Sequence, residues 1–243
     1  MPQKQDLADQ IRAEVNSLVE GVLPCINTAH VAVGGVREAA ATAIPMIFED
    51  LEALASRDTA AGSALAYVWD SYLSFRALLA YRVAHAVLGL AAAGLSGRAA
   101  ESGIAHAARR ITEEAKARTG VDIHPGARIG RRMAIDHGWG TVVGEQARIG
   151  DDCYFLQNVT LGCRRIGRPY RADECRHPTI GNRVVLAGNV CVLGPVTIGD
   201  DCLVDPGARI TTDIPAGAHV RVITKLQITQ PARQLTATKP DLR

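Results

Sequence analysis

The sequence predicts two parts of different construction, an α-helical half followed by a parallel β-helix. Residues 1–118 carry apolar side chains at three- and four-residue spacing, which is typical of amphipathic helices. From residue 121 onward an apolar residue returns every six positions instead. Apolar residues make up 47% of the chain and aromatic residues only 4%, so we expect cores built mainly from Ala, Val, Leu and Ile.

Helical spacing defines four segments of the first half, residues 6–23, 36–56, 63–90 and 99–120. Pro45 predicts a kink or boundary in the second segment, and Gly120 is a natural helix end. The apolar run 83–95 is too short to cross a bilayer and contains His85, so we expect a buried helix. The first fifteen residues lack the apolar core of a targeting peptide, so we expect none.

The second half is predicted to stack as triangular coils, because three six-residue units each give one short strand and one corner. The repeating apolar positions are Ile123, Ile129, Ile135, Val143, Ile149, Phe155, Leu161, Ile180, Leu186, Val192, Ile198, Val204 and Ile210. The register slips by two residues after Ile135 and is interrupted by a long loop after Leu161. Antiparallel strands of a sandwich would instead alternate, with turn clusters about every 8–12 residues.

Composition excludes several classes of protein. A formal net charge of +2 gives no electrostatic support for binding nucleic acid or an acidic membrane. The six cysteines include no C-x-x-C motif, so we expect neither a disulfide framework nor a zinc knuckle. We expect the protein to be in the reducing cytoplasm. Cys153 and Cys202 fall in a column otherwise filled by alanine, which predicts packing rather than chemistry.

Two features do not serve a stacking repeat. Asp136 and His137 stand together just before the register slip, and Asp122 lies 15 residues upstream of His137, close to one turn of the coil. A carboxylate on one ring nitrogen would leave the other as a general base, although His137 could instead cap a corner. The loop 162–179 carries five arginines and ends in Arg176 and His177. Such a loop binds a carboxylate or a phosphorylated cofactor, or is simply solvated.

The motifs "DIHPGARIG", "IDHGWGTVVGE", "LQNVTLG" and "RHPTIG" occur in that order, preceded by "SRDTA" and "LLAYRVAH". Together they make the chain resemble the serine O-acetyltransferases, most specifically through residues 121–210. The resemblance implies an α-helical domain at 1–120, a left-handed parallel β-helix at 121–220 with the loop at 162–179, and a tail at 221–243. It also implies a homotrimer, the pairing of two trimers into a hexamer, and active sites between neighbouring subunits.

The resemblance implies a role for each matching residue. His137 is expected to be the catalytic base and Asp122 the carboxylate that orients it. The serine-binding residues would be Asp58, Asp136, Arg176 and His177. Acetyl-CoA would lie in the groove near Gly162, Cys163, Ala187 and Gly188, and no metal is implied. The expected reaction gives O-acetylserine and CoA, the step that opens cysteine biosynthesis.

Three departures from the family pattern stand out. Cys163 replaces the second glycine of a Gly-Gly pair, and the loop 163–175 is longer and more basic than expected. The chain ends at Arg243 rather than in the isoleucine that the family inserts into the next enzyme, so we expect no tail-mediated complex with cysteine synthase. These departures indicate a paralogue of a specialised pathway.

Three alternatives stay open at this point. The first is an acyltransferase with another hydroxyl or amine acceptor. The second is a zinc enzyme of the β-helix carbonic anhydrase kind, for which His124, His137 and His177 would have to converge. The third is a catalytically silent scaffold, which would need none of the matching site residues.

Overall fold

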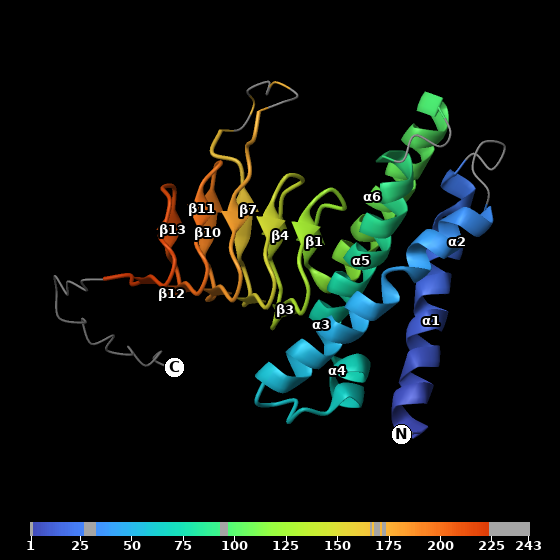
Figure 1. The fold of residues 1–243 in the computed structure, drawn as a ribbon, viewed down its shortest axis with the longest axis horizontal. Helices are drawn as coiled ribbons and strands as arrows, with labels where there is room; N and C mark the ends of the chain where they lie inside the picture. The colour runs from blue at the N-terminus through green and yellow to red at the C-terminus, as the bar shows by residue number, and fades with distance from the viewer. Residues whose placement is uncertain are drawn as a thin grey trace, which may run out of the picture.

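In the computed structural model, helices cover one end of a stack of short strands (Figure 1). The structure describes residues 2–26, 33–92, 97–165, 167, 171 and 174–223. The helices are α1 (Pro2–Val22), the 3-10 turn η1 (Leu23–Cys25), α2 (Val33–Ala41), α3 (Ile44–Arg57), α4 (Leu65–Ser71), α5 (Leu73–Ala92) and α6 (Gly97–Thr119).

Two of the predicted helices are divided in the structure. The segment 36–56 breaks before Pro45, which stands in the first turn of α3, where its missing N–H costs no hydrogen bond. The segment 63–90 breaks at Tyr72, whose backbone is extended (φ −97°, ψ 105°). The prediction of one continuous helix there was wrong, and the break turns the Tyr72 side chain toward Asp58.

Helix α5 belongs to both cores of the protein. Phe75, Leu79 and Val83 pack among the helices, whereas Leu78 and Tyr81 pack in the core of the β-helix. The Tyr81 hydroxyl donates to the carbonyl of Ala127 (2.8 Å) and accepts from the N–H of Ile129 (3.1 Å). The stretch Leu73–Ala91 is long and apolar enough to cross a membrane, but 61% of it is buried inside the protein. Helix α5 is therefore a core helix, and it closes one end of the β-helix.

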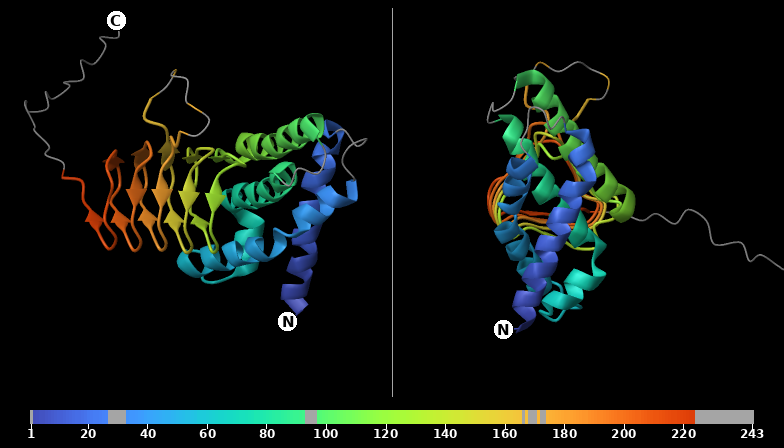
Figure 2. Two further views of the ribbon diagram at one scale, coloured as in Figure 1. Left: turned by 45° about the horizontal axis from the view of Figure 1, so that its top comes forward. Right: turned by 90° about the vertical axis from the view of Figure 1, so that its right-hand side faces the viewer.

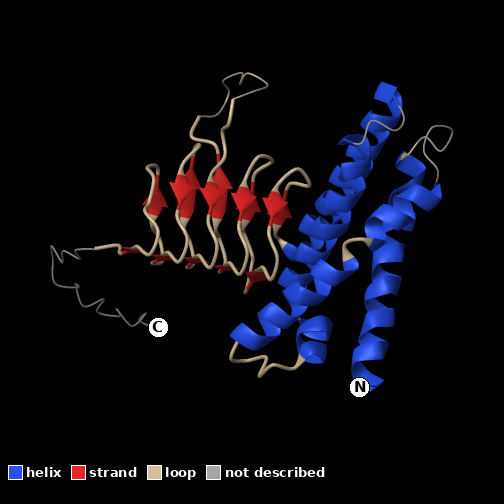
Figure 3. Cartoon of the chain, viewed as in Figure 1, coloured by secondary structure: helices blue, strands red, loops and turns tan. Residues whose placement is uncertain are grey.

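The strands form three parallel sheets, the faces of a prism (Figures 2 and 3). Sheet 1 contains β1 (Asp122–Ile123), β4 (Val142–Val143), β7 (Thr160–Gly162), β10 (Cys191–Leu193) and β13 (Arg209–Ile210). Sheet 2 contains β2 (Arg128–Ile129), β5 (Arg148–Ile149), β8 (Thr179–Ile180) and β11 (Thr197–Ile198). Sheet 3 contains β3 (Ala134–Ile135), β6 (Tyr154–Phe155), β9 (Val185–Leu186), β12 (Leu203–Val204) and β14 (His219–Val220).

The predicted register is confirmed. Every repeating apolar position is buried, with 7% exposure at most, at Ile129. The register slip is absorbed at one corner: Asp122 pairs with Val142, whereas Val142 pairs with Thr160 one regular turn later. Cys153 and Cys202 are buried as predicted, and burial raises the pKa of the Cys153 thiol to about 11.

A ladder of side chains explains the glycine that follows many of the repeating residues. Asp151 accepts the N–H of Arg131, Asn182 accepts the N–H of Asp151, and each bond is 2.8 Å long. A Cβ placed on Gly130 would lie 2.3 Å from the Asp151 carboxylate. Glycine is therefore needed where the side chain of the next coil crosses the corner.

Candidate active site

The site residues predicted in the β-helix lie on sheet 1 and on the two edges of the prism that flank it. The 3/1 edge, between sheets 3 and 1, consists of the corners 136–141, 156–159, 187–190 and 205–208. The 1/2 edge, between sheets 1 and 2, consists of the corners 124–127, 144–147 and 194–196 and of the loop that precedes β8. Sheet 1 separates the two edges.

His137 stands on the 3/1 edge, at the corner enlarged by the register slip. Its backbone is in the left-handed region (φ 56°), and Gly138 and Gly140 after it also have positive φ. This tight turn leaves the imidazole side chain 70% exposed, beside a hollow of about 500 Å³. The hollow brings His137 together with Asp136 and with Asp58, which follows α3.

Both carboxylates of this hollow are held by hydrogen bonds. Asp136 accepts the N–H of His137 (2.8 Å) and the hydroxyl of Tyr154 (2.8 Å). Asp58 accepts the N–H of Ala60 (2.9 Å) and the hydroxyl of Tyr72. The hollow therefore presents two fixed carboxylates beside an exposed imidazole, a combination that can bind a cation and accept a proton.

Arg176 and His177 lie on the 1/2 edge, at a second hollow of about 270 Å³ that Asp122, His124 and Glu145 also line. The Arg176 guanidinium binds the carboxylate of Glu145 (2.6 Å), and its backbone N–H donates to the side chain of Gln146 (3.0 Å). The His177 ring lies over Gly144, where a Cβ would come within 2.2 Å of Nε2. A planar, permanently charged guanidinium at this hollow suits a carboxylate ligand.

Hydrogen bonds assign the tautomers of the two histidines of this second hollow. The N–H of Gln146 donates to Nδ1 of His177 (3.3 Å), and the N–H of Gly126 donates to Nδ1 of His124 (3.0 Å). Burial lowers the pKa of both imidazoles, with the Arg176 charge acting in the same direction on His177. Each ring is therefore neutral near pH 7 and carries its proton on Nε2.

Asp122 and His137 are not in contact within one subunit. The Asp122 carboxylate binds Lys116 (2.8 Å) and Arg109 (3.3 Å) instead. Spacing along the coil suggested otherwise, but the residue that stacks on Asp122 is Val142, and His137 lies before it at the 3/1 edge. The carboxylate within 4.0 Å of Nε2 of His137 is that of Asp136, at 3.9 Å.

The residues expected near CoA are divided between the same two edges. Gly162 and Cys163 lie at the 1/2 edge, and Ala187 and Gly188 at the 3/1 edge. Cys163 does not have a positive φ, so its side chain fits where a glycine was expected. Gln157 lies over Gly188, where a Cβ would be 2.8 Å from its amide nitrogen, and its buried Oε1 has no hydrogen-bond partner in the described part of the chain.

Sequence reasoning missed Tyr72, Tyr154 and Glu145. Glu145 ends the quoted motif "VVGE" and could have been selected with it. Tyr154 is a strand position that points away from the prism core, and Tyr72 lies at an unpredicted helix break, so neither had a usable signal.

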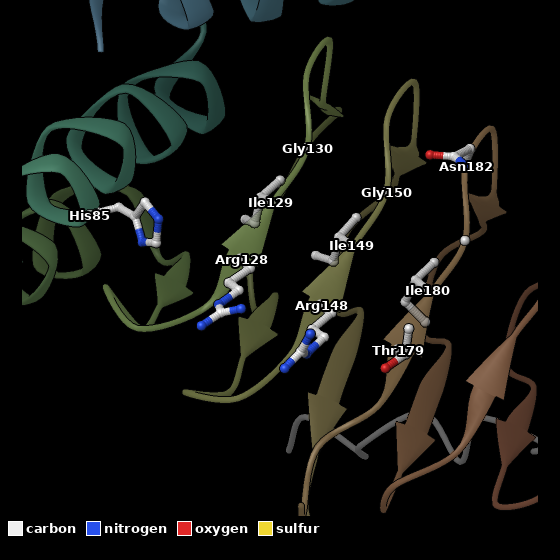
Figure 4. Close-up of a pocket in the computed structure, with 11 residues that line it drawn as sticks. His85, Arg128, Ile129, Gly130, Arg148, Ile149, Gly150, Thr179, Ile180 and Asn182 are labelled. Atoms are coloured by element: carbon white, nitrogen blue, oxygen red, sulfur yellow. The ribbon is translucent and has the colours of Figure 1, made fainter. Parts of the chain in front are cut away.

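A third hollow, of about 520 Å³, lies on sheet 2 and contains none of the predicted site residues (Figure 4). Arg128 and Arg148 stand in register there, near His85 of α5. Across the residues that the structure describes, no group of three or more His, Cys, Asp or Glu could hold a metal ion. Residues 166, 168–170, 172 and 173 of the long loop, and the tail from residue 224, lie outside the described residues.

Comparison with known proteins adds independent information. Residues 177–212 match the family model described as bacterial transferase hexapeptide (six repeats). The chain is 38% identical over 159 residues to a serine acetyltransferase of Helicobacter pylori, covering 63% of this chain and 83% of the relative. It is 37% identical over 171 residues to a serine acetyltransferase of Mycobacterium tuberculosis, covering 70% of this chain and 67% of the relative.

Solved structures agree with the sequence relatives. The structure of Entamoeba histolytica serine acetyltransferase isoform 3 in complex with cysteine aligns with a TM-score of 0.68 and 30% identity, over 93% of this chain and 72% of that one. The soybean serine acetyltransferase complexed with serine aligns with a TM-score of 0.62 and 27% identity, over 86% of this chain and 79% of that one.

Proposed function

The chain belongs to the serine acetyltransferase family, and from this premise we propose that it transfers the acetyl group of acetyl-CoA to the hydroxyl of L-serine. The products are O-acetylserine and CoA, the serine acetylation step of cysteine biosynthesis. The observation that carries the proposal in this chain is the pair of hollows, one with a base and two carboxylates and one with an arginine.

The two hollows are halves of one site in this proposal. The half at the 3/1 edge offers His137 and carboxylates for an ammonium group. The half at the 1/2 edge offers Arg176 for a carboxylate. An amino acid acceptor carries both groups, so it needs both halves of the site. Within one subunit, however, the two halves of the site lie on opposite sides of sheet 1. A ring of three subunits brings the 3/1 edge of each against the 1/2 edge of the next, which is a closed heterologous assembly.

In this homotrimer, serine lies between two subunits. Arg176 pairs with the serine carboxylate, and Nε2–H of the neutral His177 is a second donor on the same side. Asp58 and Asp136 of the neighbouring subunit receive the ammonium. Held at both ends, the serine hydroxyl lies near His137, and positioning of this kind supplies much of the rate of a two-substrate reaction.

His137 acts as the general base. The imidazole takes the hydroxyl proton while the serine oxygen attacks the thioester carbonyl of acetyl-CoA. The tetrahedral intermediate expels the CoA thiolate, which takes the proton back from the imidazolium as the C–S bond breaks. Asp122 of the subunit that supplies Arg176 faces the imidazolium and stabilises it. A positioned base of this kind contributes about 10²–10⁴-fold.

Acetyl-CoA is a substrate in this scheme and lies along the groove between the two edges. Gly162 and Cys163 line one wall of the groove, and Ala187 and Gly188 line the other. The unpartnered Oε1 of Gln157 is an acceptor for an amide N–H of the pantetheine arm. No step of the scheme needs a metal. The helical halves are the surfaces by which two trimers would pair into a hexamer, and the six free thiols suit a cytoplasmic enzyme.

CoA release from acetyl-CoA tests the proposal, with L-serine, D-serine, homoserine, threonine and amino sugars as acceptors and His137→Ala beside the wild type. Fastest turnover of L-serine, abolished in the variant, supports it. If L-serine is ignored while another hydroxyl acceptor reacts through His137, the substrate is wrong and the basic loop before β8 is the first region to examine. If no acceptor depends on His137, the mechanism is wrong.

A further inference from the structure

The two carboxylates beside His137 are held in the same way. One oxygen of Asp136 accepts a backbone N–H (2.8 Å) and the other accepts the Tyr154 hydroxyl (2.8 Å). One oxygen of Asp58 accepts a backbone N–H (2.9 Å) and the other accepts the Tyr72 hydroxyl. A carboxylate has about four acceptor positions, so each keeps room for a further donor.

Neither carboxylate is neutralised within the described part of the subunit. Asp58 and Asp136 form no ion pair with a lysine or arginine there. Arg57, the residue before Asp58, donates instead to the carbonyl of Asp152 (2.9 Å) and to its carboxylate (3.3 Å). The hollow therefore holds two oriented negative charges, which favour a compact cation such as an ammonium group.

The two tyrosines remain donors at all working pH values. The hydrogen bond to Asp58 raises the pKa of Tyr72 to about 12. Burial and then the bond to Asp136 raise the pKa of Tyr154. The Asp136 charge also raises the pKa of Tyr72, and the Asp58 charge raises that of Tyr154. Asp58, Tyr72 and Asp136 line one hollow, and Tyr154 binds Asp136, so the four side chains form one cluster.

The cluster joins the two halves of the chain. Tyr72 and Asp58 come from the helical half, and Tyr154 and Asp136 come from the β-helix. Neither carboxylate can swing away without losing a charge-assisted bond, so their separation is set before the acceptor arrives. Groups fixed in this way bind without reorganisation.

We propose that Tyr72 and Tyr154 are positioning residues of the acceptor site, which hold Asp58 and Asp136 in the arrangement that receives the ammonium group of the acceptor. The inference rests on the proposed function and deepens it. It assigns recognition of the amino group to a four-residue cluster, and it makes two tyrosine hydroxyls determinants of specificity for amino acid acceptors.

The test is steady-state kinetics of Tyr72→Phe and Tyr154→Phe, which delete one hydroxyl each and keep the rings. Each should raise the KM for L-serine about 10-fold, because the released carboxylate must be ordered again when the ammonium group binds, with kcat changed less than about twofold and the KM for acetyl-CoA unchanged. The matched control is Tyr67→Phe, because Tyr67 is 49% exposed and its ring packs on that of Tyr72, at 5.8 Å between centroids, while the hydroxyl that holds Asp58 is that of Tyr72. It should behave as the wild type.

A second acceptor separates positioning from mere structural support. 3-Hydroxypropanoate has the hydroxyl and carboxylate of serine but no amino group. The wild type should prefer serine strongly, and both Phe variants should lose about 10-fold of that preference. An unchanged KM for serine, or equal losses on both acceptors, overturns this inference while the proposed function stands. A wild type that does not turn over L-serine overturns the proposed function itself.

Discussion

Arg82 of α5 and Asp50 of α3 form a bidentate ion pair, with N–O distances of 2.8 and 3.1 Å. Their side chains are only 3% and 1% exposed. The same guanidinium donates to the carbonyls of Ile129 (2.6 Å) and Gly130, and the Asp50 carboxylate accepts the N–H of Met133 (2.9 Å). The pair is therefore a buried polar joint between the helices and the first coil of the β-helix.

Asp50→Asn should destabilise the protein by about 3–5 kcal/mol, because it leaves the Arg82 charge buried without its counter-ion. Urea unfolding followed by circular dichroism measures the loss. The control is Arg37→Ala, which removes an exposed pair with Glu20 and should cost about 1 kcal/mol or less. Equal effects of the two variants would show that the joint does not depend on its charges.

The separation of His137 from Arg176 predicts that two inactive variants restore activity together. His137→Asn damages the 3/1 edge and Arg176→Gln damages the 1/2 edge. A mixed trimer has three interfaces, and one of them combines the two intact edges, so trimers that carry both variants should recover about a third of the wild-type rate. Co-expression with two different affinity tags, followed by tandem purification and the CoA-release assay, measures the recovery.

A matched control uses two lesions on one edge. Asp136→Asn lies on the same edge as His137, so mixing it with His137→Asn should recover nothing. If this mixture recovers as much as the first one, the gain comes from something other than shared sites. If neither mixture recovers activity, each subunit contains a complete site and the trimeric arrangement is refuted.

Much of the β-helix could be read from the sequence, because every turn repeats the same requirement for an apolar residue in the prism. Ile129, Ile149 and Ile180 stack in one sheet, and the pattern predicts each of them. Spacing alone could not place His137 relative to Asp122. The corner residues at a register slip have no repeat to fix them, and only the structure shows that Asp122 pairs with Val142.

The helical half was harder to predict for a related reason. The run 63–90 is strongly apolar on both sides of Tyr72, so nothing in its periodicity marks the break there. The break is stabilised by a contact with Asp58, 14 residues away, and by burial of α5 against two cores. Interactions between distant residues decide such positions, and local propensity does not.

Acid should destabilise the protein through His124 and His177. Burial lowers the pKa of both below the ordinary 6.5, so the folded protein binds fewer protons than the unfolded chain once the pH falls below 6.5. The free energy of unfolding therefore falls with pH through this window, until the folded-state pKa is reached. The nearby Glu145 carboxylate opposes the shift at both rings, and the Arg176 charge reinforces it.

Urea midpoints at about pH 7 and about pH 5.5 measure this dependence. The double variant His124→Asn/His177→Asn keeps an acceptor at each Nδ1 position but cannot be protonated, so its stability should change less between the two pH values than that of the wild type. His106→Asn, at an exposed position of α6, serves as the control. A double variant with the full wild-type dependence would assign the acid sensitivity to other groups.

Gly144→Ala should impair catalysis without unfolding the β-helix. The added Cβ would lie 2.1 Å from Cδ2 and 2.2 Å from Nε2 of His177, so the imidazole must leave its place on the 1/2 edge. Loss of the oriented Nε2–H donor should raise the KM for L-serine about 10-fold. Gly89→Ala is the matched control, since a Cβ there meets nothing within 4 Å and alanine favours the α5 helix. The clash is with the imidazole of His177 and not with the backbone of a neighbouring coil, so the side chain can move while the coil keeps its shape. The melting temperature of Gly144→Ala should therefore stay close to that of the wild type, and a large fall in it would mean that the His177 ring supports the fold rather than the substrate.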